Sequence, residues 1–227
     1  MFVVFEGVDG SGKTTIINEV VKYFKSKVSM EDQVAATREP GGNDISEQIR
    51  EIILSKSNTK ITPMTEMLLF AASRSQFITD TLKPLLNKKK LVISDRYYYS
   101  SLIYQGVLHN IYEPTLATNL FATEGVEADI TFFIDVPYNE IKRRLECRSQ
   151  SNRLDCMGDW YYEKIIEGYW NLSENMVVID GDREISKIVK DVIEIIEREM
   201  EFVEKKMKRT IDTSKTHSGV QKVPYLK

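Results

Sequence analysis

The sequence has few cysteines and little excess charge, and each shortage excludes a class of protein. Cys147 and Cys156 are the only cysteines among 227 residues, too few for a disulfide scaffold or a structural zinc set. The formal net charge is −3, whereas a nucleic-acid binder usually relies on a strongly basic surface. We therefore expect reduced thiols in the cytoplasm and no nucleic-acid partner.

The sequence also lacks a basic leader with a cleavage site and any apolar run long enough to cross a bilayer. Its first apolar residues, Phe2 to Phe5, are needed for an initial strand. We expect neither an export signal nor a membrane partner. The length and the 42% hydrophobic content allow one good core, so a single domain is predicted over residues 1–200.

Short β-rich apolar runs alternate with stretches of helical periodicity. This alternation predicts an α/β fold with a five-stranded parallel sheet flanked by helices on both faces. The predicted strands cover residues 2–5, 33–37, 91–94, 130–134 and 176–179. The predicted helices cover residues 14–25, 45–54, 65–82, 114–122, 138–147 and 159–170, and one begins at residue 184. Ligands bind such a sheet beyond the carboxyl ends of its strands, so polar residues placed there are the first candidates for chemistry.

Two segments fall outside this alternation. A polar stretch over residues 148–153 predicts a small lid at about 148–158. From about Glu201 the apolar periodicity fades and the sequence becomes basic and hydroxyl-rich, which predicts a frayed helix end and a flexible basic tail over residues 201–227.

A complete phosphate-binding loop follows the first predicted strand. It reads Gly7-Val8-Asp9-Gly10-Ser11-Gly12-Lys13-Thr14 and is followed by Thr15. Glycines let backbone N–H groups curl around an anion, while the lysine reaches the β/γ-phosphates and the hydroxyl of Thr14 can ligate Mg²⁺. The helix that follows points its positive end at the same phosphates. These nine residues are therefore predicted to bind ATP, with Lys13 also catalytic.

A second set of motifs follows later strands in a fixed order. Residues 37–42 read Thr-Arg-Glu-Pro-Gly-Gly, residues 95–97 read Asp-Arg-Tyr, and residues 104–106 read Tyr-Gln-Gly; Leu-Leu-Phe-Ala-Ala-Ser-Arg occupies 68–74 and Asn-Arg-Leu-Asp occupies 152–155. With the phosphate loop, this series resembles the thymidylate kinases, and its Arg-Glu-Pro-Gly-Gly stretch is similar to their bacterial-type branch. The resemblance covers about residues 1–200. It implies a P-loop nucleoside monophosphate kinase-like fold and Mg²⁺-dependent transfer of a phosphoryl group from ATP to dTMP, giving dTDP for DNA precursor synthesis.

Arg38 and Arg96 are guanidinium forks at two strand ends and are predicted to grip the acceptor monophosphate. Phe70 and Arg74 are four residues apart on one helix face, where a ring can stack on a base and a guanidinium can donate to its carbonyl. The resemblance identifies that base as thymine. It also implies that Ser101 and Gln105 contact the pyrimidine edge and that Tyr104 crowds the 2′ face of the sugar.

The remaining predicted site residues serve charge neutralisation. Asp9 is an unusual carboxylate inside an anion-binding loop, which suits service to Mg²⁺ or to the acceptor. Asp95 either supports Mg²⁺ through water or anchors Arg96. Since position 10 is glycine, the resemblance implies a catalytic arginine supplied from the lid, where Arg148 and Arg153 are the candidates and Arg153 fits the motif better.

Other functions are weighed against this one. A kinase for another deoxynucleotide fits the same motifs, whereas a nucleoside kinase would need a carboxylate base and fewer phosphate-gripping arginines. A GTPase-like switch would carry Asn-Lys-x-Asp, and the nearest segment, residues 87–90, lacks the aspartate. A catalytically inactive relative is a further alternative. The resemblance also implies a homodimer built through helices that flank the sheet.

Overall fold

The computed structural model describes residues 1–27, 30–146 and 158–216, with the backbone alone at residues 204 and 206–216. The chain divides into two compact units, Met1–Val189 and Lys190–Lys227. The first unit contains a five-stranded sheet in the order β2-β3-β1-β4-β5, and all of its strand pairs are parallel. Its strands are β1 (Phe2–Glu6), β2 (Val34–Arg38), β3 (Leu91–Asp95), β4 (Ile130–Asp135) and β5 (Val177–Asp180). The predicted fold class is confirmed.

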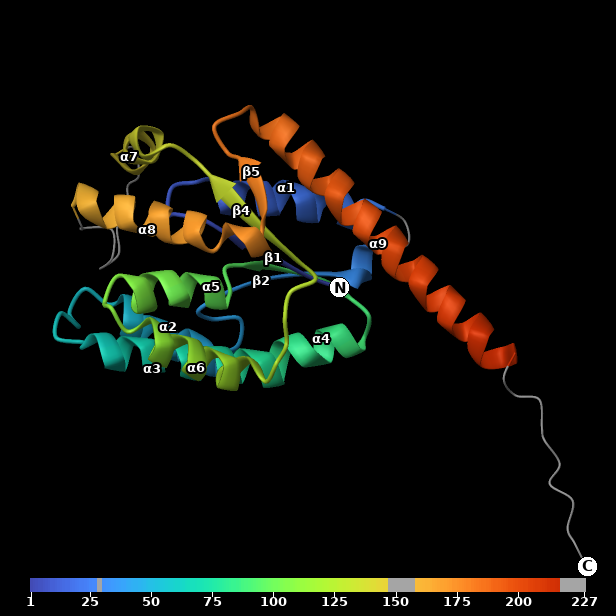
Figure 1. Cartoon of the computed structure of the whole chain (residues 1–227), viewed down its shortest axis with the longest axis horizontal. Coiled ribbons are helices and arrows are strands. Elements are labelled where there is room, and N and C mark those ends of the chain that lie inside the picture. The colour runs from blue at the N-terminus through green and yellow to red at the C-terminus, as the bar shows by residue number, and fades with distance from the viewer. Residues whose placement is uncertain (28–29, 147–157, 217–227) are drawn as a thin grey trace, which may run out of the picture. The chain divides into compact units, whose positions relative to one another are not determined.

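Helices cover both faces of this sheet, with α1 on one side and the layer of α3, α4 and α6 on the other (Figure 1). Because both faces are covered, consecutive residues of β1 are all buried rather than alternating in exposure. The helices are α1 (Lys13–Lys25), η1 (Glu31–Gln33), α2 (Asp44–Leu54), α3 (Pro63–Phe77), η2 (Ile78–Leu82), α4 (Lys83–Asn87), α5 (Tyr98–Ser101), η3 (Leu102–Val107), α6 (Tyr112–Thr123), α7 (Tyr138–Glu146), α8 (Asp159–Asn171), η5 (Ser173–Asn175) and α9 (Ile185–Thr216).

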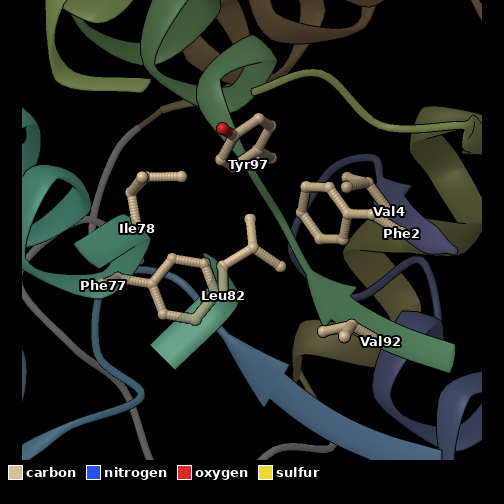
Figure 2. Packing of buried hydrophobic residues seen from close by; sticks show 7 residues of the cluster. All are labelled: Phe2, Val4, Phe77, Ile78, Leu82, Val92 and Tyr97. Carbon is tan, nitrogen blue, oxygen red and sulfur yellow. The ribbon is translucent and has the colours of Figure 1, made fainter. Parts of the chain in front are cut away.

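One part of the core joins the sheet to the helical segment formed by α3 and η2. Phe2 and Val4 of β1 and Val92 of β3 face the helical residues Phe77, Ile78 and Leu82, with Tyr97 closing the cluster (Figure 2). The rings of Phe2 and Tyr97 meet edge to face at 5.1 Å between centroids. Tyr97 thereby fixes the start of α5, and the residues just before it, Asp95 and Arg96, are held at the end of β3.

The predicted ends of two helices are wrong, and one helical segment was not predicted. The helix predicted over residues 65–82 is α3, which passes through the π-helical turn η2 into α4. Pro84 lies in the first turn of α4. The wide π turn before it relieves the clash that a proline ring makes with the carbonyl four residues earlier. The helical segment over residues 98–107, which is absent from the predicted set, is α5 and η3.

The third difference concerns the C-terminus. Helix α9 extends to Thr216, beyond residue 201 where fading apolar periodicity predicts its end. Charged pairs one turn apart, such as Lys205 with Glu201 at 3.2 Å, support such a solvated helix. The division of the chain at residue 200 stays a prediction, and residues 217–227 lie outside the described residues. No helix in the described part of the chain is long and apolar enough to span a membrane.

Candidate nucleotide-binding site

The phosphate-binding loop connects β1 to α1 and is built around left-handed glycines. Gly10 has φ 89° and Gly12 has φ 92°, a region that residues with a Cβ rarely adopt. A Cβ on Gly7 would lie only 2.7 Å from the carbonyl oxygen of Ile134. Glycine at these positions therefore allows both the turn and its close approach to β4.

Lys13 is buried beneath this loop. Its Nζ donates to the carbonyl oxygens of Gly7 and Val8, both at 2.9 Å, and to Ser11 Oγ at 3.4 Å. Burial lowers the pKa of Lys13 to about 8, assisted by the nearby Arg96 guanidinium and opposed by neighbouring carboxylates. The loop thus holds an ammonium group whose hydrogen-bond partners are neutral oxygen atoms.

A hydroxyl and a carboxylate meet where α1 begins and β3 ends. Thr14 Oγ1 donates to Asp95 Oδ2 at 2.8 Å. Both are hard oxygen donors of the kind Mg²⁺ prefers, and this ion typically takes one or two protein ligands alongside waters and substrate phosphates. The described residues contain no cluster of three or more histidines, cysteines, aspartates or glutamates suited to a metal. The Thr14 hydroxyl and the Asp95 carboxylate together match the one or two protein ligands that Mg²⁺ takes beside substrate phosphates.

Arg96 directly follows β3 and lies next to the phosphate loop. It has φ 74°, and its backbone N–H donates to Phe5 O at 2.9 Å. Its Nη2 donates to Asp9 Oδ1 at 2.8 Å and lies 3.4 Å from the Tyr104 hydroxyl. The guanidinium is therefore held facing the phosphate loop, with Asp9 as its counter-charge.

Arg38, at the end of β2, is the second arginine of this region. Its Nη2 lies 3.0 Å and 2.8 Å from the two carboxylate oxygens of Glu47 in α2. Glu47 also accepts from the Gly42 N–H at 3.0 Å. Arg50, one turn further along α2, donates to Pro40 O at 2.8 Å. Glu47 and Arg50 were not predicted from the sequence, although their place in the first helix after the Arg-Glu-Pro-Gly-Gly stretch is the signal that could have identified them.

One cavity of about 810 Å³ brings the two arginines and the phosphate loop together. Of the predicted site residues, twelve line it: Asp9, Gly10, Gly12, Lys13, Thr14, Thr15, Arg38, Phe70, Asp95, Arg96, Tyr104 and Gln105. Glu39, Glu47 and Arg50 also line it. Residues from the ends of β1, β2 and β3 therefore meet in one space, as parallel strands require.

Arg74 and Ser101 are not among the lining residues. Arg74 is 2% exposed; its Nε donates to Glu39 Oε2 at 2.6 Å and its Nη1 to Ser101 Oγ at 3.1 Å. Its other contacts are with Asn119 Oδ1 and, at 3.2 Å, Tyr97 O. Phe70 lines the cavity whereas Arg74 lies buried, so their sharing one helix face does not give them equal access to a ligand. Contact between Arg74 and a base stays a prediction.

Glu39 was also not predicted as a site residue. Burial raises the pKa of Glu39 to about 7, although the Arg74 guanidinium opposes this shift. Its second oxygen, Oε1, is buried without a hydrogen-bond partner, as is Oε1 of Gln105. Gln105 Nε2 donates to the buried Glu66 at 2.9 Å. Buried polar groups of Glu39 and Gln105 thus lie at the wall of the cavity that Phe70 and Tyr104 also line.

Arg148 and Arg153 fall within residues 147–157, outside the described residues, as do the two cysteines and nearly all of the predicted lid.

Comparison with known proteins agrees with this geometry. The thymidylate kinase family profile matches residues 5–192. A thymidylate kinase from Ligilactobacillus salivarius is 42% identical over 202 residues, which are 86% of this chain and 96% of that protein. One from Thermosipho africanus is 39% identical over 205 residues, 88% of this chain and 100% of the relative.

A solved structure extends the agreement to three dimensions. The crystal structure of thymidylate kinase from Ehrlichia chaffeensis has a TM-score of 0.69 and 28% sequence identity, and the match covers 86% of this chain and 98% of that one. The phosphate loop, the arginine pair and the sheet order are consistent with the profile match and with these relatives. This chain belongs to the thymidylate kinase family.

Proposed function

We propose that this protein transfers the γ-phosphoryl group of ATP to dTMP. An oxygen of the dTMP phosphate forms a bond to the γ-phosphorus as the bond between that phosphorus and the β–γ bridging oxygen breaks, giving dTDP and ADP. The observation that carries the proposal is the single cavity in which the phosphate loop faces Arg38 and Arg96. A donor triphosphate and an acceptor phosphate both need cationic and N–H donor groups, and residues of both kinds line this cavity.

The acceptor side needs little acid–base chemistry. The phosphate of dTMP is already ionised near neutral pH, so no residue has to remove a proton from it. Catalysis then rests on positioning and on neutralising charge that spreads over the transferred group. We assign this role to Lys13 and Arg96, with Arg38 gripping the acceptor. We propose that Arg148 and Arg153, in the lid, also help to neutralise the charge on the transferred group.

Asp9 links the two substrates. Its carboxylate pairs with Arg96 at 2.8 Å and belongs to the loop that carries Lys13. In this position the Asp9 carboxylate restrains Arg96 before the acceptor phosphate binds. Its negative charge also repels an anion that binds without a cation to neutralise it.

Mg²⁺ is the proposed cofactor, and when bound it would neutralise charge on the phosphates of ATP. Thr14 and Asp95 would hold it, since their oxygens lie 2.8 Å apart at the loop's edge. Asp9 is a further candidate ligand.

The base would occupy the end of the cavity lined by Phe70, Tyr104 and Gln105. A ring at Phe70 can stack on a pyrimidine, and an unpartnered amide oxygen at Gln105 can accept from an N–H of the base. Arg74 and Ser101 lie behind this lining and are proposed to complete base recognition. Tyr104 would then lie beside the sugar.

We also propose that two chains associate through α2, α3 and α6. These helices carry a group of large apolar side chains that are exposed in the single chain: Ile45, Ile52, Met64, Leu68, Leu120 and Phe121. Phe121 is 86% exposed, which is costly for a phenylalanine unless another surface covers it.

We also propose that the protein acts in the cytoplasm, where both nucleotides are available.

Product analysis tests the reaction. The full chain, incubated with ATP, Mg²⁺ and dTMP, should produce dTDP and ADP in equal amounts when the nucleotides are separated by anion-exchange chromatography. ADP without dTDP would mean that water, and not dTMP, accepts the phosphoryl group, and would overturn the proposal.

A further inference from the structure

Glu6, the last residue of β1, is a buried carboxylate that the proposed mechanism does not use. Its side chain is fully buried. Its Oε1 accepts from the backbone N–H groups of Tyr97 at 2.9 Å and Ser100 at 3.2 Å. Its Oε2 accepts from the hydroxyls of Ser100 at 2.5 Å and Tyr169 at 2.9 Å. The carboxylate therefore connects β1 to α5 and α8, elements that are far apart in the sequence.

The same two hydroxyls contact Arg96. Its Nη1 lies 2.8 Å from Ser100 Oγ and 3.0 Å from the Tyr169 hydroxyl, whereas Nη1 and Glu6 Oε2 are 4.0 Å apart. The two hydroxyls thus link the Glu6 carboxylate to the Arg96 guanidinium, which are too far apart to form a direct hydrogen bond. Each hydroxyl has one proton to donate and lone pairs with which to accept.

The chemistry of the two charged groups fixes the direction of these bonds. A carboxylate only accepts and a guanidinium only donates. Ser100 and Tyr169 therefore donate their protons to Glu6, and both accept from Arg96. Bonds in such a buried, charge-polarised network strengthen one another.

The other terminal nitrogen of the guanidinium, Nη2, contacts Asp9 and Tyr104. Asp9, Arg96 and Tyr104 all line the cavity. The backbone of Arg96 is itself constrained, because a non-glycine residue with φ 74° persists only where its surroundings hold it. Because the guanidinium is planar and rigid, hydrogen bonds that fix Nη1 also fix the directions in which Nη2 and Nε point.

We propose that Glu6 is a positioning residue which, through the hydroxyls of Ser100 and Tyr169, orients Arg96 toward the acceptor phosphate. The inference rests on the proposed function, since it concerns the arginine assigned to dTMP. Glu6 makes no contact with substrate in this role; it acts only through Arg96.

The variant Glu6→Gln tests the role. Its amide NH₂ would donate where Oε2 accepts, so the two hydroxyls could no longer both give their protons away and would bind Arg96 less well. We expect kcat/KM for dTMP to fall by about tenfold or more, with KM for ATP changing less than about twofold. Glu124→Gln is the matched control, because Glu124 is an exposed carboxylate that pairs with Lys83.

A double-mutant cycle with Arg96→Lys separates positioning from general damage. Lysine retains the positive charge but lacks the fork that the two hydroxyls hold. If Glu6 acts through Arg96, Glu6→Gln should cost less than about twofold in the Arg96→Lys background. Equal losses in both backgrounds would overturn the inference.

Removal of one bridging hydroxyl provides a test that does not depend on how well Glu6→Gln folds. Tyr169→Phe keeps the ring that stacks on Phe133 and loses only the bridge, so kcat/KM for dTMP should fall by about threefold to tenfold. Tyr97→Phe is the matched control, since the hydroxyl of this buried tyrosine donates to Val126 O at 2.7 Å. If the two variants lose activity equally, the bridge has no role in positioning.

A readout independent of catalysis distinguishes this inference from the proposed function. The Arg96 Nε–H signal, assigned in ¹⁵N NMR spectra by its absence from Arg96→Lys, should show a rigid side chain in the wild type and a mobile one in Glu6→Gln. A wild-type protein that does not phosphorylate dTMP would refute the proposed function. An Arg96 side chain equally rigid in both proteins would refute the role of Glu6.

Discussion

Thr14 Oγ1 donates a hydrogen bond to Asp95 Oδ2 over 2.8 Å, and this contact ties the helix after the phosphate loop to the end of β3. Thr14 lies in the first turn of α1, where the helix dipole favours anions, and Asp95 is the last residue of its strand. The two strands that lead into this contact are neighbours in the sheet. The metal proposed to act with ATP would therefore be held by residues on two rigid elements.

Asp95→Asn should raise the Mg²⁺ concentration needed for half-maximal activity. Asparagine retains an oxygen that can bind Mg²⁺ weakly but lacks the negative charge of aspartate. We therefore expect the Mg²⁺ requirement to increase about tenfold or more. Initial rates measured over a Mg²⁺ titration at saturating nucleotides check this. Asp80→Asn, at an exposed aspartate, should leave the titration unchanged. An Asp95→Asn enzyme with the wild-type requirement would remove Asp95 from the metal site.

Binding of ATP should become coupled to protons above neutral pH. In the ligand-free protein the pKa of Lys13 is lowered to about 8, so the ammonium loses its proton as pH rises through this value. The triphosphate favours the charged form and raises that pKa. ATP binding should therefore take up protons near pH 8.5 and weaken as pH increases further.

Calorimetry in buffers with different ionisation heats measures this proton uptake. The Lys13→Met protein, which has no titrating amine at this position, serves as the control and should lose the uptake. A wild-type heat that is the same in all buffers between pH 7 and 9 would contradict the assignment.

Glu39 should make folding stability depend on pH. Its folded pKa, raised to about 7 from an ordinary value of 4.5, means that the folded state binds the proton more tightly than the unfolded state. Ionisation of the buried Glu39 carboxyl therefore destabilises the folded state. This destabilisation is absent below about pH 4.5, grows as pH rises and is complete above about pH 7. It reaches about 3 kcal/mol at most by the linkage relation.

Glu39→Gln removes this titration, so the free energy of unfolding of the variant should improve relative to wild type as pH rises from 5 to 8. Urea denaturation at several pH values provides the measurement, with Glu51→Gln, at an exposed glutamate of α2, as the control. The opposite trend would mean that the ion pair with Arg74 dominates over burial.

The apolar surface of α2, α3 and α6 predicts the oligomeric state. Light scattering after size exclusion should give twice the chain mass of 26.2 kDa, and Phe121→Asp should give the single-chain mass. A charge buried in an apolar interface is costly. Ile185→Asp changes an exposed residue outside these three helices and should leave the mass unchanged. A wild-type single chain would refute the dimer.

Much of the fold could be predicted because its signals are local. Apolar runs and glycine spacing identify β1, the phosphate loop and α1, and parallel strands bring Arg38 and Arg96 to one edge of the sheet. Helix ends were less predictable, since the π turns before Pro84 and after Ser101 depend on packing and not on apolar spacing.

The partners of the charged residues could not be predicted in the same way. Glu6 looks like the end of a strand in the sequence, and its bonds come from residues about ninety and more than one hundred and sixty positions away. Arg74 shares a helix face with Phe70, yet its position is set by Glu39, Ser101 and Asn119 on other elements. Such pairings arise only when distant segments pack together.

The most direct test of the central claim is the initial rate of ADP release from ATP and Mg²⁺ with each deoxynucleoside monophosphate and with thymidine, using Lys13→Ala as the control. The account predicts turnover chiefly with dTMP, none with thymidine, which lacks the phosphate that the arginines grip, and loss of turnover in the control. Faster turnover with another monophosphate, or equal turnover with thymidine, would contradict it.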